Sequence, residues 1–291
     1  MIDTTLLTNY VIILTMKNIK DKLILITGGA SGIGQLMAFA FAERHARVII
    51  WDINENVMKT MEDDARAKNI FIHGMVCDVS DRNAVYSQAQ KLTAEFGPLD
   101  ILINNAGIVS KKGENVVGPA FLGVSDENII KLMNIDALSL FWTSKAFLPS
   151  MIERNSGHIV TVSSSAGIIG VKGLADYCAA KFAAFGFDES LRMELRRMKS
   201  AIKTTVVCPF FINTGMFEGV KTRFPLILPI LKKEYVVKRI VKAVLKNKKR
   251  LIMPRFVYSI YLLRLLPPTI MDGIADFFGI SHAMDDFKGR A

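Results

Sequence analysis

Short runs of β-branched and other apolar residues alternate along the chain with longer stretches of helical periodicity. The runs show no strict alternation of polar and apolar positions, which is typical of strands buried on both faces. They cover residues 23–27, 47–51, 70–76, 99–103, 158–163, 203–208 and 250–253. Because the intervening segments are long enough for crossover helices, the pattern predicts an α/β fold of the doubly wound Rossmann type. We expect one mainly parallel sheet of about seven strands with helices on both faces.

A glycine-rich segment follows the first run. Residues 27–34 read TGGASGIG and precede an apolar helical pattern. Gly28, Gly32 and Gly34 allow a tight turn and a close approach of the backbone to a pyrophosphate, which the free N–H groups and dipole of a helix amino terminus attract. Ligands of such a sheet bind beyond the carboxyl ends of the strands. The position therefore favours a dinucleotide site over a plain turn.

An acidic residue at the end of the second run indicates which dinucleotide binds. Asp52 lies 18 residues after Gly34, where a carboxylate accepts hydrogen bonds from the adenosine ribose hydroxyls. A 2′-phosphate would meet this negative charge, and Ser31 offers no positive one, so the sequence favours NAD over NADP. The alternative is that Asp52 only caps the helix that begins near Asn54.

Polar and small residues after the third and fourth runs extend the dinucleotide site. We expect Asp78 and Val79, which follow the third run, to lie beside the adenine. The sequence NNAG after the fourth run lets the backbone pass close to the cofactor. Within it, Asn105 is expected either to tie adjacent strands together or to contact the ribose.

The sequence YCAAK places Tyr177 and Lys181 one helical turn apart, so that both side chains lie on one face of a helix. A free tyrosine has a pKa near 10 and is a poor base at neutral pH, but a neighbouring ammonium group stabilises its phenolate. Ser164, which follows the fifth run, precedes Tyr177 by 13 residues. We expect Tyr177 to be an acid/base and Ser164 to orient a substrate oxygen towards it.

Four motifs in order, TGxxxGxG, NNAG, a serine and YxxxK, resemble those of the short-chain dehydrogenase/reductase family. The resemblance covers essentially residues 21–253. Longer strings such as GLADYCAAKFAAFGF and HAMD are most similar to the epidermal retinol dehydrogenase and 17β-hydroxysteroid dehydrogenase 11 group. The chain differs from that group in a shorter apolar amino-terminal segment and in a longer segment after NNAG.

This resemblance implies a catalytic set and a cofactor site. The catalytic residues would be Asn134, Ser164, Tyr177 and Lys181, with Asn134 holding a water that links Lys181 to solvent. The cofactor residues would be Gly28, Ser31, Gly32, Ile33, Gly34, Asp52, Asp78, Val79, Asn105, Ala106, Gly107, Tyr177, Lys181, Pro209, Ile212 and Thr214. The family also implies a homodimer.

The chain is expected to have three parts. They are an apolar amino-terminal segment over 1–20, the NAD-binding short-chain dehydrogenase/reductase domain over 21–254, and an apolar extension over 255–291. The apolar part of the first segment, residues 4–16, is too short to span a membrane and lacks the features of a signal peptide. The extension could close a hydrophobic substrate pocket together with residues 210–231, pack in a dimer, or lie on a membrane.

The net charge of +10 is concentrated between residues 232 and 255, where ten basic residues face one acidic residue. Apolar residues recur there at helical spacing, which predicts an amphipathic helix whose basic outer face is either solvated or set on a membrane surface. Because no aromatic residues alternate with these charges, a nucleic-acid partner is disfavoured. The three cysteines are expected to be reduced and buried, and the four histidines show no metal-ligand spacing, so no metal site is expected.

Together these features predict an NAD-dependent oxidoreductase that interconverts a lipophilic alcohol and its carbonyl, with retinol or a hydroxysteroid as the substrate class. Two alternatives stay open: a ketone or 3-oxoacyl reductase of lipid metabolism, and an NAD-binding protein whose main role is interaction at a lipid surface. The expected location is the cytoplasm, either free or peripheral on a membrane or lipid-droplet surface.

Overall fold

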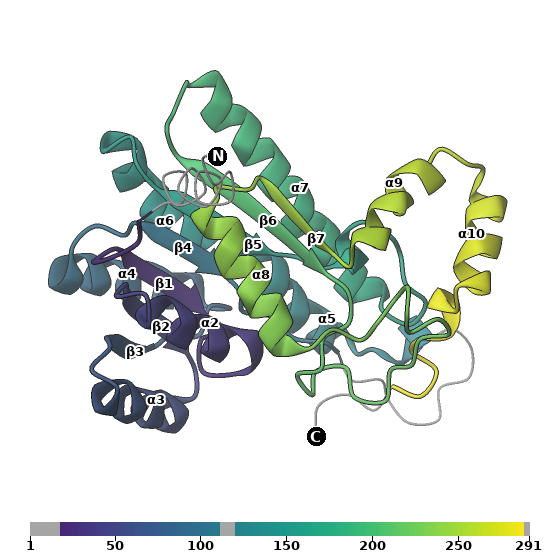
Figure 1. Cartoon of the computed structure of the whole chain (residues 1–291), viewed down its shortest axis with the longest axis horizontal. Coiled ribbons are helices and arrows are strands. Elements are labelled where there is room, and N and C mark those ends of the chain that lie inside the picture. Colours follow the sequence, from purple (N-terminus) through teal and green to yellow (C-terminus); the bar gives the residue numbers. More distant parts are fainter. Residues whose placement is uncertain (1–17, 111–119, 288–291) are drawn as a thin grey trace, which may run out of the picture.

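A single seven-stranded sheet forms the centre of the molecule (Figure 1). The computed structural model describes residues 18–110 and 120–287. All strands are parallel and lie in the order β3-β2-β1-β4-β5-β6-β7. The strands are β1 (Leu23–Thr27), β2 (Arg47–Asp52), β3 (Ile72–Val76), β4 (Ile101–Asn104), β5 (His158–Val162), β6 (Lys203–Pro209) and β7 (Arg250–Met253). The predicted fold class is confirmed, and the largest differences are at β3 and β4, which each begin two residues later than expected.

Helices connect the strands and cover the sheet (Figure 1). The α-helices are α2 (Gly32–Ala42), α3 (Glu55–Ala67), α4 (Arg82–Phe96), α5 (Asp126–Met133), α6 (Ser139–Glu153), α7 (Ala175–Arg197), α8 (Lys233–Leu245), α9 (Ile260–Leu263) and α10 (Pro268–Phe277). Shorter turns are η1 (Ala120–Gly123), the π-helical η2 (Asn134–Leu138), η3 (Ser165–Gly167), η4 (Arg255–Ser259) and η5 (Ile280–His282). Helix α2 packs beside α8, and α4 packs beside α6.

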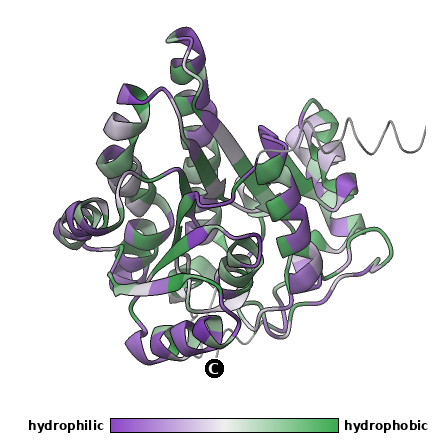
Figure 2. Cartoon of the chain, turned by 60° about the vertical axis from the view of Figure 1, so that its left-hand side comes forward, coloured by the Kyte–Doolittle hydropathy of each residue, from purple (hydrophilic) through white to green (hydrophobic). Residues whose placement is uncertain are grey.

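Strand β1 shows why the strands read as continuous apolar runs. Its Ile24 and Ile26 belong to the core cluster that contains residues of α2, α3 and α8. Its Leu23 and Leu25 belong to the cluster that contains residues of α4, α6 and α7. Because successive side chains point to opposite faces, and both faces are covered, the first four positions of β1 are apolar, and the buried Thr27 at its end uses its hydroxyl as a hydrogen-bond acceptor. In Figure 2 much of the central sheet is green, towards the hydrophobic end of the scale.

The predicted amphipathic helix is α8. Val236, Ile240 and Val244 on one side are buried, whereas Lys238 and Lys242 on the other are exposed. The apolar side packs towards α2 in the core, so the basic side faces outward.

The residues that follow β7 fold back over the carboxyl end of the sheet. They form η4, α9, α10 and η5, and aromatic contacts join them to the segment after β6, with ring centroids of Phe224 and Phe278 5.8 Å apart. The predicted apolar segment at residues 4–16 lies outside the described residues, as does part of the long segment after NNAG. Within the described ranges, no helix has both the length and the apolar character needed to cross a membrane. All three cysteines are free and buried, as predicted.

Candidate active site

The glycine-rich turn lies between β1 and α2 and is tightly packed. Gly28 and Gly32 have φ angles of +64° and +56°, which favour glycine. A Cβ added to Gly34 would lie 2.2 Å from the carbonyl oxygen of Gly28, so only glycine fits there. The hydroxyl of Ser31, at the N-cap of α2, makes no capping hydrogen bond. The amino terminus of α2 therefore lines a cavity with N–H groups suited to a phosphate.

The side chain of Asn105 ties adjacent strands, which is one of the two alternatives left by the sequence; its contact with a ribose stays a prediction. Its Nδ2 donates to the carbonyl oxygens of Thr27 (2.9 Å) and Gly28 (3.1 Å). The hydroxyl oxygen of Thr27 in turn accepts from the backbone N–H groups of Asn105 and Ala106. These bonds hold the ends of β1 and β4 together, and they place Ala106 and Gly107 along the cavity.

Asp52 lies at the end of β2, beside the glycine-rich turn. Its Oδ2 accepts from the backbone N–H of Ala30 (2.9 Å), and its Oδ1 accepts from that of Asn54 (3.0 Å). The N-cap of α3 is Asn54, whose side chain accepts from the N–H of Val57, so Asp52 is not itself the cap. Each carboxylate oxygen has a further lone pair free for a ribose hydroxyl.

The predicted cofactor residues fall into two groups. Thirteen line one cavity: Gly28, Ser31, Gly32, Ile33, Gly34, Asn105, Ala106, Gly107, Tyr177, Lys181, Pro209, Ile212 and Thr214. Asp52, Asp78 and Val79 are not among its lining residues. The carboxylate of Asp78 accepts from the N–H and hydroxyl of Ser80 in the turn after β3, and Val79 is buried in the core.

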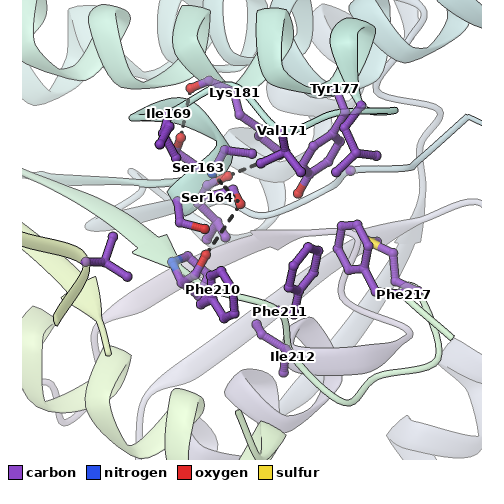
Figure 3. A pocket seen from close by; sticks show the side chains of 18 of the residues that line it. Ser163, Ser164, Ile169, Val171, Tyr177, Lys181, Phe210, Phe211, Ile212 and Phe217 are labelled. Carbon is purple, nitrogen blue, oxygen red and sulfur yellow. Dashed lines mark hydrogen bonds between the residues drawn. The ribbon is translucent and has the colours of Figure 1, made fainter. Parts of the chain in front are cut away.

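Ser164, Tyr177 and Lys181 meet in the same cavity (Figure 3). Ser164 is the N-cap of η3; its hydroxyl oxygen accepts from the N–H of Ala166 (3.1 Å), and the hydroxyl donates to the carbonyl of Pro209 (3.4 Å). Tyr177 and Lys181 come from the first turns of α7, and the Lys181 ammonium lies 5.4 Å from the centre of the Tyr177 ring. The geometry thus brings together three of the four predicted catalytic residues.

The fourth position differs from the prediction. The ammonium of Lys181 lies 2.9 Å from Oδ2 of Asp136, and both side chains are buried. Oδ1 of Asp136 accepts from the backbone N–H of Ile108 (2.8 Å). Among the described residues, Asp136 lines the cavity and Asn134 does not. The structure places Asp136, rather than the predicted Asn134, at Lys181, because residues two apart in a helical turn point in different directions.

Burial and charge act on the ionisable groups in opposite directions. Burial raises the pKa of the Tyr177 phenol, and the positive charge of Lys181 opposes that rise while the Asp136 carboxylate adds to it. Burial alone would lower the pKa of Lys181, but Asp136 and Tyr177 raise it, and the net direction is upward. Burial also raises the pKa of the Asp136 carboxyl, and the charge of Lys181 and the N–H of Ile108 oppose that rise.

The far end of the cavity is apolar. Phe210, Phe211 and Phe217, which follow β6, lie opposite Tyr177 in Figure 3, and the Tyr177 and Phe217 rings make an edge contact at 5.7 Å. The extension completes the wall with Leu263, Met271, Ile274 and Phe278. The sequence had indicated that both segments could close a hydrophobic pocket.

Asp136 lines the cavity and contacts Lys181, but the sequence motifs do not single it out. A signal for it exists, because it is an acidic residue in the apolar string Ile135, Ala137 and Leu138. A carboxylate in such a place needs a partner, and the buried Lys181 supplies it.

Comparison with known proteins identifies the family. The pattern of the short chain dehydrogenase family matches residues 22–223. The chain is 46% identical to human epidermal retinol dehydrogenase 2, over 93% of this chain and 86% of that protein. It is 45% identical to the mouse protein of the same name, over 94% and 87%, and 40% identical to retinol dehydrogenase 10-B of Danio rerio, over 94% and 87%.

Solved structures share the fold. One is a short chain dehydrogenase/reductase from Burkholderia phymatum in complex with NAD, with a TM-score of 0.74 at 22% identity, covering 86% of this chain and 95% of that one. Another is a metagenomic short-chain oxidoreductase in complex with NADP, with a TM-score of 0.66 at 22% identity, covering 81% and 96%. The chain belongs to the short-chain dehydrogenase family and is an oxidoreductase that acts on CH–OH groups with a nicotinamide cofactor.

Proposed function

We propose that this protein interconverts a lipophilic alcohol and its carbonyl, of the retinol or hydroxysteroid class, with NAD as the cofactor and Tyr177 as the acid/base. One observation carries the proposal: a single cavity runs from the glycine-rich turn, past Ser164 and Tyr177, to an apolar end closed by α9 and α10. The names of the retinol dehydrogenase relatives support the same substrate class.

The cavity residues fit a nicotinamide dinucleotide and divide the work between them. Backbone N–H groups at the start of α2 would hold the pyrophosphate, and Gly107 lines the cavity close to Lys181. The nicotinamide ring, when bound, accepts or supplies hydride. In oxidation Tyr177, as phenolate, removes the hydroxyl proton, while Ser164 donates a hydrogen bond that orients the substrate oxygen. In reduction the same groups act in reverse.

The preference for NAD depends on the carboxylate of Asp52. This group is half-buried at the end of β2 and lies next to the turn that would hold the phosphates. A 2′-phosphate placed there would be repelled, and Ser31 cannot compensate with a positive charge.

The apolar wall supports a long hydrophobic substrate. Aromatic and aliphatic side chains from the segment after β6 and from α10 surround the end of the cavity beyond Tyr177. Transfer of such a substrate from water would contribute roughly 25 cal/mol for each Å² of apolar surface buried, so a short alcohol would bind far less well. A homodimer and a peripheral position on a membrane or lipid droplet stay predictions.

A substrate screen with purified protein tests the proposal. All-trans-retinol, hydroxysteroids, long-chain alcohols and ethanol are each assayed with NAD and with NADP by nicotinamide absorbance. We expect turnover with at least one retinoid or steroid, little with ethanol, and a higher kcat/KM with NAD. Tyr177→Phe is the matched control: it should lose nearly all turnover but keep NAD affinity within severalfold. Undiminished turnover in that variant, or equal activity with ethanol and retinol, would contradict the proposal.

A further inference from the structure

Lys181 and Asp136 form a buried ion pair beside Tyr177, the proposed acid/base. Lys181 is 4% exposed and also donates to the carbonyl oxygen of Val162 at 3.3 Å. Asp136 is 1% exposed and is fixed by the N–H of Ile108. A Cβ added to Gly107 would lie 2.8 Å from Oδ2 of Asp136 and 3.3 Å from the ammonium, so the pair is closely enclosed. The ammonium near Tyr177 therefore has the Asp136 carboxyl group directly beside it.

We propose that Asp136 is a positioning residue that offsets the charge of Lys181, keeps Tyr177 protonated to higher pH, and so favours reduction of a carbonyl over oxidation of an alcohol near neutral pH. The inference rests on the proposed role of Tyr177 as the acid/base.

A lone ammonium beside Tyr177 would stabilise its phenolate. A lysine without a carboxylate partner would lower the pKa of a nearby tyrosine by about 1–3 units. The carboxylate of Asp136 opposes this effect in two ways, since it neutralises Lys181 at 2.9 Å and acts directly on the phenol. In a buried site such interactions are only weakly screened by solvent.

The remaining groups around the pair do not cancel the effect of Asp136. On α7, the carboxylate of Asp176 raises the pKa of Asp136, and Cys178 raises the pKa of Tyr177. On β6, Cys208 raises the pKa of Lys181. Against them, the hydroxyl of Ser164, after β5, lowers the pKa of Tyr177. Apart from Lys181, no positively charged side chain is among the described residues that line the cavity, so Lys181 has no second cation to support it.

The favoured step is the reduction of a carbonyl to an alcohol. The carbonyl carbon gains a C–H bond with the two electrons of a hydride from the reduced nicotinamide, and the C=O π bond breaks. The carbonyl oxygen gains the proton of Tyr177, whose O–H bond breaks, and the alcohol and oxidised cofactor are released. Tyr177 then regains a proton from water.

Replacing Asp136 by asparagine tests the proposal, because the amide keeps the shape and can still accept from Ile108. We expect the acidic limb of the oxidation profile and the basic limb of the reduction profile, both plotted as kcat against pH, to move down by about one unit or more. Oxidation below the wild-type limb should then rise about tenfold. Asp188→Asn is the matched control, since Asp188 is equally buried but lines a different cavity, and its limbs should not move. If Asp136 only holds Lys181 in place, kcat falls in both directions with the limbs unchanged, and the proposal is overturned.

A second measurement needs no variant of Asp136. The phenolate absorbance of the cofactor-free protein is titrated, and subtraction of Tyr177→Phe isolates the signal of Tyr177. We expect a midpoint above the ordinary tyrosine value near 10. A midpoint well below it would overturn the proposal even if Asp136→Asn does not fold. This titration does not depend on turnover. A protein that oxidises no alcohol and reduces no carbonyl would therefore refute the proposed function while leaving the effect of Asp136 on Tyr177 separately measured.

Discussion

The buried carboxyl group of Asp188 should make the stability of the folded protein fall as pH rises. Asp188 lies in α7, is 1% exposed, and burial raises the pKa of its carboxyl from 3.8 to about 7, although Arg192 and the hydroxyl of Thr204 oppose the rise. Thr204 donates to Oδ2 at 3.4 Å, whereas Oδ1 has no hydrogen-bond partner among the described residues. The protonated form therefore fits the folded protein better than the charged form.

The sign and size of the effect follow from the two pKa values. Between about pH 4 and pH 7 the folded protein binds more protons at this residue than the unfolded chain does, so the free energy of unfolding falls as pH rises. One pKa unit corresponds to about 1.4 kcal/mol, and a rise of about three units corresponds to about 4 kcal/mol. This contribution is fully present below pH 4 and is lost as pH rises through 7.

Urea unfolding of wild type and Asp188→Asn at pH 5, 6, 7 and 8 measures the effect. The amide does not titrate, so the difference in free energy of unfolding should move in favour of the variant by about 2.5 kcal/mol between pH 5 and pH 8. The amide N–H groups that Asp188→Asn introduces would lack a hydrogen-bond acceptor. This lowers the free energy of unfolding by about 1–3 kcal/mol at every pH and does not change its slope with pH. Two parallel stability curves would refute the reasoning, since they would mean that Asp188 titrates alike in both states.

Three further predictions concern the cofactor turn and the surface. Gly34→Ala should weaken NAD binding at least tenfold in a fluorescence titration, because the added Cβ would lie 2.2 Å from the oxygen of Gly28; unchanged affinity would mean that the turn can relax. Asp52→Ala should raise the affinity for NADP relative to NAD, and an unchanged ratio would mean that Asp52 serves only the backbone of the turn. Leu262 and Leu265, which are 71% and 81% exposed, should contribute to binding of anionic liposomes. The double change to serine should reduce flotation with them, and equal flotation of both proteins would place the contact elsewhere.

The fold could be predicted from the sequence because the central strands are buried on both faces. Strand β1, for example, is buried at all five positions, and its first four residues are apolar, so its character was visible without knowledge of its neighbours. The glycine-rich turn was equally visible, since Gly28 and Gly34 are required by the local backbone itself. Features that depend only on local conformation or on burial of a whole segment can be read from a single chain.

The partner of Lys181 could not be found in the same way. The sequence pattern predicts a regular helix that continues through Asn134. In the structure the π-helical turn η2 interrupts this helix and sets the direction of the Asp136 side chain. Which of two polar residues in one turn faces a lysine 45 positions later depends on the packing of α5, η2 and α7 together. That packing is a tertiary property, and no periodicity in the sequence encodes it.

The site is assembled from parts with different origins, and this separates its chemistry from its selectivity. The proposed proton-transfer groups lie at the end of β5 and in the first turns of α7, and the glycine-rich turn proposed to hold the cofactor lies between β1 and α2. These positions are fixed by the sheet, which the solved structures share at only 22% identity. The apolar end is built by the segment after β6 and by α9 and α10, which no strand constrains. A substitution in that wall can change which carbonyl compound binds without moving Tyr177. A substitution at Asp136 is expected to change the pH at which Tyr177 loses its proton, without changing the wall. We therefore expect the wall substitution to change the ranking of substrates by kcat/KM and the Asp136 substitution to change the pH profile. In a protein that carries both substitutions, the two effects should add.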